Sequence, residues 1–76
     1  MTQVSKKAQE GLKAFVEVAR LAEGDVNKLA RAYNTAKEQT KDSAKAQAEL
    51  NIRLTQVTNG HKELEAAVRT AAKTQQ

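Results

Sequence analysis

Residues 35–50 read TAKEQTKDSAKAQAEL, and the fold depends on what this stretch does. It contains no glycine, no proline and no large apolar residue before Leu50. Such a stretch can be a turn that folds two helices back on each other, or the polar middle of one long helix. The residues on either side of it bear on the choice between these two shapes.

The composition of the whole chain indicates helices. Its 76 residues are 39% hydrophobic and 29% charged, they include no proline, and their aromatic residues are Phe15 and Tyr33. Ala, Lys, Gln, Glu, Thr and Leu dominate, as in helices and helical bundles. A domain of this size buries only about 60% of its unfolded surface and is marginally stable alone. Because the chain has no cysteine and a single histidine, close helix packing or self-association must supply the remaining stability.

A seven-residue repeat runs through nearly the whole chain. Alternating steps of three and four residues from Leu12 meet small or large apolar residues at most positions, and the polar exceptions include Thr40, Ser43, Gln47 and His61. A sustained heptad indicates helices that pack along a shared apolar seam. We therefore predict an all-α protein, one helical unit over residues 1–76, that self-associates as a coiled coil or helical bundle. The predicted oligomer seam consists of Leu12, Phe15, Val26, Leu29, Tyr33, Leu50, Leu54, Val57, Leu64 and Val68.

The apolar stripe is wider than this seam. The positions beside it hold mostly small apolar residues such as Val18 and Ala32 rather than charges, which suits three or more packed helices. Residues 11–24, GLKAFVEVARLAEG, carry several large apolar residues and few charges. They lack the tryptophan and the dense Lys/Arg face of a membrane-surface helix, so we interpret them as an ordinary packing helix and expect no membrane contact.

Three arrangements of the helices fit this pattern. In a helical hairpin, the chain turns near residues 40–43, Asp42 or Ser43 caps the second helix, and two hairpins form a four-helix bundle. In a three-helix arrangement, Gly24 and Gly60 separate helices over roughly 3–23, 25–58 and 61–75, and Asp25 caps the second. In a continuous rod, one helix about 110 Å long passes through all of these positions.

We favour the rod over the other two arrangements. The heptad phase crosses both glycines unchanged, and a true break would have no reason to preserve it. Connections between antiparallel helices commonly contain glycine, and residues 40–43 contain none.

No residue pattern in the chain indicates catalysis. His61 is the one side chain suited to general-base chemistry near neutral pH. No phosphate-binding loop, nucleophile elbow, zinc-binding helix or paired-carboxylate motif accompanies it. We interpret His61 as a seam or helix-capping residue, and we predict a protein that is not an enzyme and has no cofactor and no metal site.

Basic residues outnumber acidic ones by 13 to 9, and the net charge of +4 permits an anionic partner. The residues that share one heptad position, and would form a positive stripe on a continuous helix, are Lys6, Lys13, Arg20, Lys41, Lys62 and Arg69. Such a stripe could follow a phosphate backbone. Glutamates lie three or four residues from several of these positions, as on ordinary solvated helix faces. We therefore expect a solvated face rather than a nucleic-acid site.

The texture of residues 24–72 resembles the Ala/Lys/Gln-rich helical segments of phage tail tape measure proteins. The runs KLARAYNTAKEQ and AELNIRLTQ carry the resemblance, because short apolar seams alternate with Thr, Gln and Asn. Tape measure proteins are long, mostly helical proteins that lie inside the tail tube and set its length. The resemblance implies an oligomeric helical rod with a structural role and no catalysis, and it carries no functional residues over to this chain.

These observations lead to one expected function and two alternatives. We expect a non-catalytic structural or assembly component of a phage or phage-like tail particle, which acts as an oligomeric rod or spacer and binds itself. A small helical regulator or inhibitor of a host protein is the first alternative, and a basic nucleic-acid-binding module is the second. The N-terminus lacks the apolar core of a signal peptide, and no stretch approaches the ~18 apolar residues of a membrane span. We therefore expect a cytoplasmic or virion-associated protein.

Overall fold

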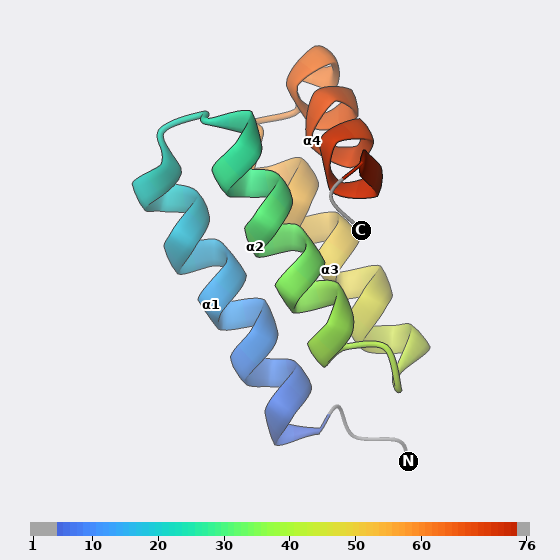
Figure 1. The fold of residues 1–76 in the computed structure, drawn as a ribbon. Coiled ribbons are helices and arrows are strands. Elements are labelled where there is room, and N and C mark those ends of the chain that lie inside the picture. Colours follow the sequence, from blue (N-terminus) through green and yellow to red (C-terminus); the bar gives the residue numbers. More distant parts are fainter. Residues whose placement is uncertain (1–4, 75–76) are drawn as a thin grey trace.

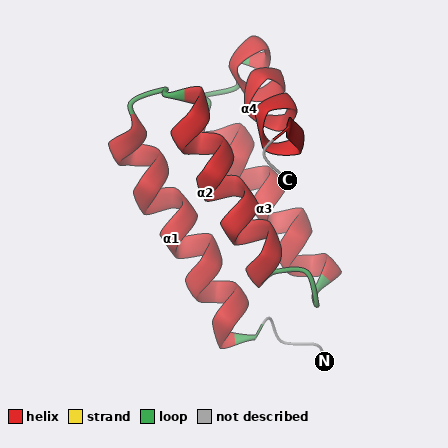
Figure 2. Cartoon of the chain, viewed as in Figure 1, coloured by secondary structure: helices red, strands yellow, loops and turns green. Residues whose placement is uncertain are grey.

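Residues 5–74 form four helices and leave the helical conformation at three places between them. The computed structural model describes residues 5–74, which form α1 (Lys6–Ala22), α2 (Val26–Gln39), α3 (Ala44–Val57) and α4 (Lys62–Thr74). The described residues contain helices and short connections and no strand (Figure 1 and Figure 2). The predicted all-α class is confirmed, and the predicted continuous rod is wrong.

A polar side chain begins each helix. Ser5, Asp25, Ser43 and His61 each accept a hydrogen bond from the backbone N–H three residues later, over 3.1–3.2 Å. Such caps satisfy one of the N–H groups that the first turn of a helix leaves unpaired. The sequence predicts the Asp25 cap, and of the two candidates Asp42 and Ser43 the structure selects Ser43.

Two of the three turns depend on left-handed backbone. The angle φ is positive at Glu23 and Gly24 (51° and 82°) and at Asn59 and Gly60 (56° and 70°). Glycine adopts this conformation without the steric conflict that a Cβ introduces, so helices often end there. At the turn between α3 and α4, the Gly60 N–H donates to the Thr55 carbonyl at 3.0 Å, as in a Schellman motif. Both glycines therefore end helices, and the expectation that one helix passes through them is wrong.

The turn between α2 and α3, at residues 40–43, needs no glycine because none of its residues has a positive φ. Thr40 ends α2 with φ −108° and ψ 3°, and its hydroxyl donates to the Ala36 carbonyl at 2.8 Å. The Ser43 N–H donates to the Thr40 carbonyl at 3.1 Å, and Ser43 then caps α3. Short polar side chains give the backbone local hydrogen bonds that compete with a helix. The absence of glycine from residues 40–43 is therefore no sign of a continuous helix.

The four helices pack into one bundle. α1 and α2 lie antiparallel side by side, α3 returns to pack against both, and α4 packs against α2 (Figure 1). The Cα atoms extend over 36 × 24 × 19 Å, far less than the ~110 Å expected for the rod. The radius of gyration is 11.6 Å, close to the roughly 11.4 Å of a compact chain of this length. One chain is therefore a complete bundle, where the hairpin arrangement needed two.

The predicted oligomer seam lies inside this single chain. The buried seam residues are Phe15, Leu29, Tyr33, Leu50, Leu54 and Val68, and those half-buried against them are Leu12, Val26, Val57 and Leu64. The rings of Phe15 and Tyr33 meet edge to face with their centroids 6.2 Å apart. Each helix turns one apolar stripe towards a common core. Four short helices of this kind show the same heptad pattern in the sequence as one long helix would. The seam between chains is thus corrected to a core within one chain.

α1 and α2 approach each other closely where Gly11 faces Gln39. A Cβ added to Gly11 would lie 2.5 Å from Gln39 Oε1 and 2.9 Å from Gln39 Cβ. Small residues at helix contacts allow short distances between helix axes. The buried small residues of α1 and α2 are Ala8, Gly11, Ala19, Ala22, Ala30 and Ala36. This contact also fixes which residues of α1 and α2 lie at the same level.

Candidate functional site

An open groove runs between α1 and α2. It has a volume of about 390 Å³ and is lined by residues of these two helices alone. From α1 the lining residues are Gly11, Ala14, Phe15, Val18, Leu21 and Ala22, and from α2 they are Lys28, Arg31, Ala32, Thr35, Ala36 and Gln39. Phe15, Ala22 and Ala36 are buried at its base. The groove is therefore mainly apolar, with polar and charged groups along α2.

Two large apolar side chains on the wall of this groove face solvent. Leu21 is 79% exposed and Val18 is 42% exposed. A single exposed apolar side chain is ordinary on a protein surface, but several together over a concavity indicate a contact site. The other large apolar side chain exposed in the described residues is Ile52 of α3, at 50%, and it does not line the groove. The groove is therefore the strongest candidate for a binding site in this structure.

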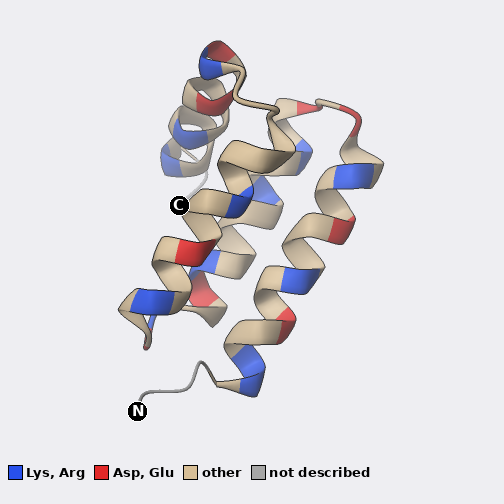
Figure 3. Ribbon diagram, turned by 180° about the vertical axis from the view of Figure 1, so that it is seen from behind, with Lys and Arg blue, Asp and Glu red and all other residues tan. Residues whose placement is uncertain are grey.

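The charged residues of the groove lining are both basic and both belong to α2: Lys28 and Arg31. No acidic residue is among the lining residues, and Glu17 of α1 lines a separate depression together with Lys13 and Arg53. Among the residues that the structure describes, neither Lys28 nor Arg31 forms an ion pair. Acidic and basic residues alternate along α1, as Figure 3 shows.

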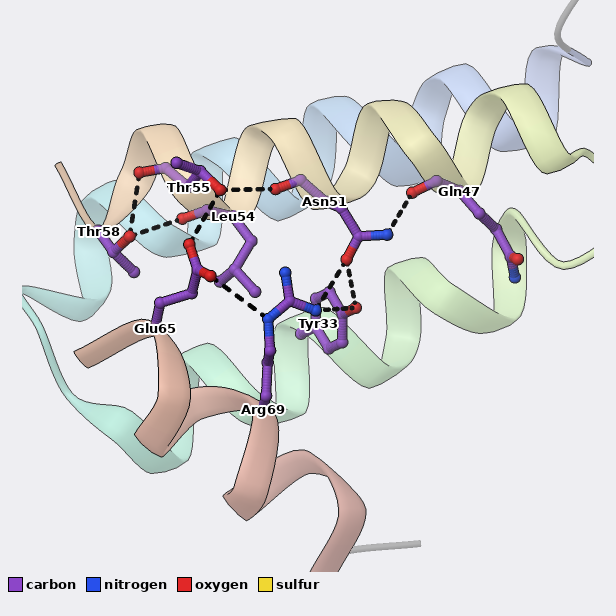
Figure 4. Close-up of polar contacts among 8 residues, drawn as sticks. All are labelled: Tyr33, Gln47, Asn51, Leu54, Thr55, Thr58, Glu65 and Arg69. Atoms are coloured by element: carbon purple, nitrogen blue, oxygen red, sulfur yellow. Dashed lines mark hydrogen bonds and ion pairs between the residues drawn. The ribbon is translucent and has the colours of Figure 1, made fainter. Parts of the chain in front are cut away.

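A polar cluster elsewhere in the bundle joins α2, α3 and α4 (Figure 4). Asn51 Oδ1 accepts hydrogen bonds from the Tyr33 hydroxyl and from Arg69 Nη1, each at 2.9 Å. The Arg69 guanidinium lies 5.9 Å from the centroid of the Tyr33 ring and 3.5 Å from Glu65 Oε2. Glu65 in turn accepts a hydrogen bond from the Thr55 hydroxyl at 2.9 Å. We call these five residues the α4 clamp, because their contacts hold α4 against the other helices.

The six residues of the predicted basic stripe do not share one face. Lys6, Lys13 and Arg20 lie on α1, Lys41 lies in the turn after α2, and Lys62 and Arg69 lie on α4. Arg69 belongs to the α4 clamp rather than to an open surface. The stripe presupposes one continuous helix, and the three turns reorient the segments that carry it. The continuous stripe is therefore a wrong prediction, and binding of an anionic partner stays a prediction.

Lys41 forms an ion pair with Glu38 at the end of α2, over 2.7 Å. The hydrogen bond from Lys41 lowers the pKa of Glu38 from its ordinary value of 4.5, and the same bond raises the pKa of Lys41 from 10.5. The two side chains are 58% and 70% exposed, so solvent screens the pair and it contributes little to stability.

His61 is exposed and caps α4, where its Nδ1 accepts a hydrogen bond from the Leu64 N–H at 3.2 Å. This contact agrees with the interpretation of His61 as a capping residue. Across residues 5–74, no group of three or more His, Asp or Glu side chains could hold a metal ion. In the same span, each helix is too short or too polar to cross a bilayer.

The sequence contains a partial signal for the groove. Val18 widens the apolar stripe beyond the heptad seam, and residues 11–24 are rich in large apolar side chains. The exposure of Leu21 depends on which side of α1 the other helices cover, and the heptad does not encode that choice.

No protein-family model, no curated protein and no solved structure matches the chain. The resemblance to tape measure proteins therefore stays a prediction from residue texture, and the functional argument rests on the groove.

Proposed function

We propose that the protein is a non-catalytic assembly component that binds another protein chain through the groove between α1 and α2. The observation that carries this proposal is the 79% exposure of Leu21, beside Val18, on the wall of an apolar groove. Burying a leucine side chain stabilises it by about 1.5–3 kcal/mol relative to leaving it exposed. The bundle leaves Leu21 exposed and gains none of this free energy. A partner that covers the groove would bury Leu21, and the complex would gain it.

The shape of the groove suits a helix of the partner. Two neighbouring helices leave between them a depression that a third helix fills with side chains spaced by three and four residues. Small side chains at Ala14 and Ala32 would let the partner's backbone come close. Lys28 and Arg31 would set its orientation, because charges at the edge of an interface govern encounter and specificity more than affinity.

This proposal keeps the assembly role expected from the sequence and changes its mechanism. A chain that extends over 36 Å cannot bridge the ~110 Å of the expected rod. A compact contact module therefore replaces the spacer. The setting in a phage or phage-like tail particle is supported by the resemblance of residues 24–72 and by nothing else.

A small regulator that binds a host protein is the second candidate function. The compact single-chain bundle favours it over a spacer, because a regulator needs a stable surface and no particular length. It would use the same groove, so the identity of the bound protein separates the two candidates. The dispersed basic residues give no support to the nucleic-acid alternative.

Photocrosslinking in the source cells tests the proposed function. A tagged chain carries a photoreactive amino acid in place of Thr35, an exposed residue of the groove lining. We expect a covalent adduct whose yield falls several-fold when Leu21→Lys is added and stays unchanged with Ile52→Lys, the matched control outside the groove. Equal yields from the two variants would refute binding through the groove. Circular dichroism verifies that both variants remain folded.

A further inference from the structure

The charges inside the groove between α1 and α2 bear on the chemistry of its occupant. The charged lining residues are Lys28 and Arg31, and no acidic residue belongs to the lining. Among the described residues, neither of the two has an ion-pair partner within the chain. Helix spacing places another basic residue, Lys7, one turn before Gly11 at the opposite end of the groove. Unmatched positive charges beside an apolar surface are complementary to a partner that carries carboxylates next to its own apolar residues.

The carboxylates of α1 and α2 do not neutralise the groove lining. Asp25 Oδ1 accepts a hydrogen bond from the Lys28 N–H and so caps α2. Glu38 is held in an ion pair at the far end of α2. The acidic residues of α1 are Glu10 and Glu17, and neither lines the groove. The ammonium of Lys28 and the guanidinium beside it are therefore left for a group from outside the chain.

The two basic lining residues lie at the same end of the groove as its most exposed apolar side chain. Because Gly11 lies beside Gln39, residues of α1 and α2 whose numbers sum to about 50 lie at the same level of the bundle. Lys28 and Arg31 then lie within about two residues of the level of Leu21, or ~3 Å along the helix axis. A partner that covers Leu21 therefore brings its neighbouring side chains to both basic groups.

A helix can meet the apolar wall and the basic groups together. If its apolar side chains pack on Val18 and Leu21, an adjacent row of its side chains faces α2. Lys28 and Arg31 are three residues apart, which corresponds to ~4.5 Å along α2. Carboxylates three or four residues apart on the partner helix have a similar spacing. An amphipathic helix with acidic residues along one border of its apolar stripe combines these features.

Other anionic partners match the groove less well. A nucleic acid offers phosphates but no apolar row for Val18 and Leu21, and its binding depends on many Lys and Arg contacts where the lining provides two. An anionic membrane surface binds helices that carry a dense Lys/Arg face beside a broad apolar face. Leu21 and Val18 instead lie on the wall of a concavity, which suits an inserted helix.

We infer that the occupant of the groove is an acidic amphipathic helix, with its apolar side chains on Val18 and Leu21 and its carboxylates on Lys28 and Arg31. The inference rests on the proposed function and names the chemical class of the partner. The apolar contact supplies affinity, and the two charge contacts select acidic helices over basic ones.

Photocrosslinking from Thr35 in the source cells, repeated with charge reversals, tests this inference. Lys28→Glu combined with Arg31→Glu should lower the yield of the adduct at least about fivefold, because two attractions become two repulsions. Lys13→Glu combined with Arg20→Glu is the matched control. It changes the net charge of the chain equally but lies on α1 outside the groove lining, so the yield should stay unchanged.

Mass spectrometry of the adduct identifies the partner segment at the crosslink. We expect apolar residues spaced by three and four in that segment, with Asp or Glu beside them. Replacing those acidic residues of the partner by lysine should lower the yield with the wild-type chain. The same replacement should restore the yield with the variant that carries both Lys28→Glu and Arg31→Glu. A failure to restore it would overturn the charge contacts.

The outcomes separate this inference from the proposed function. An adduct that depends on Leu21 but not on Lys28 and Arg31, or that forms in a segment without acidic residues, would overturn the acidic helix and leave the proposed function standing. A Leu21-dependent adduct between two copies of this chain would do the same if both charge variants gave equal yields. If no Leu21-dependent adduct with a protein forms, both are refuted.

Discussion

Replacing Asn51 by alanine tests whether side-chain hydrogen bonds hold α4 on the bundle. Asn51 Oδ1 accepts one bond from the Tyr33 hydroxyl and one from the Arg69 guanidinium. A neutral hydrogen bond contributes about 1 kcal/mol, and one to a charged group contributes about 1.5–3 kcal/mol. The Arg69 side chain is 38% exposed, so we take the low end for its bond. Alanine regains about 0.5 kcal/mol through its higher helix propensity. The expected net decrease in the free energy of unfolding is therefore about 2 kcal/mol.

A double-mutant cycle isolates the shared bond. Tyr33→Phe removes the hydroxyl and keeps the ring contacts with Phe15 and Arg69, so it should cost about 1 kcal/mol. Because Tyr33→Phe and Asn51→Ala remove the same bond, the double variant should lose about 1 kcal/mol less than the sum of the single losses.

Urea unfolding followed by circular dichroism measures these free energies of unfolding. A chain of this length is expected to have a total stability of roughly 4–11 kcal/mol, so a loss of about 2 kcal/mol is large. It should lower the midpoint of thermal unfolding by about 8–16 °C. A loss below about 0.5 kcal/mol with no coupling to Tyr33→Phe would show that the α4 clamp contributes nothing, and that apolar contacts alone hold α4.

Three further predictions concern α1, a helix cap and the pair at the end of α2. Gly11→Ala should lower the free energy of unfolding by about 1 kcal/mol in urea titrations. The added methyl group would overpack against Gln39 Cβ at a cost of about 2 kcal/mol, which exceeds the ~1 kcal/mol gained in helix propensity. A variant more stable than the wild type would contradict this. Ser43→Ala should lower it by about 1 kcal/mol in the same assay, and Ser43→Gly by a few tenths, because the capping oxygen is lost; no loss with alanine would refute the cap. Lys41→Gln should raise the pKa of the Glu38 carboxyl in an NMR titration, because the bond that lowers it is gone. Since that pKa lies below its ordinary 4.5, the small stabilisation from the pair is present above about pH 4.5 and is lost as the pH falls through the folded-state pKa; an unchanged Glu38 titration would refute the ion pair in solution.

Local signals in the sequence mark most helix boundaries, but the unbroken heptad phase outweighed them in the prediction of a rod. Asp25 and Ser43 are short polar residues ahead of apolar-periodic runs, and Gly24 and Gly60 supply the left-handed backbone that ends a helix. The hairpin and the three-helix arrangement therefore each contained part of the answer, and the favoured rod contained none of the three turns. The structure combines the hairpin turn at residues 40–43 with the breaks at both glycines.

What the sequence left open depends on contacts between helices. A heptad shows that each segment has one apolar stripe, but not whether another segment or another chain covers it. Thr40 was a polar residue at a seam position. It is fully buried, and its hydroxyl is satisfied there because it donates to the Ala36 carbonyl. Arg69 looked like a solvated stripe residue, and it belongs to the α4 clamp because α4 lies across from Tyr33 and Asn51. The groove needs the relative placement of α1 and α2, which no local signal contains.

The short turns have a consequence for folding kinetics. Each connection is only three or four residues long, so successive helices meet after closing a small loop, and the entropy cost of loop closure is low. Bundles with mostly local contacts fold within microseconds to milliseconds. The Asn34 side chain reaches the Ala72 carbonyl, 38 residues away, so we expect the docking of α4 to be the late step. Fast folding would expose the core residues only briefly, and the large apolar side chains that other molecules then meet are Val18, Leu21 and Ile52.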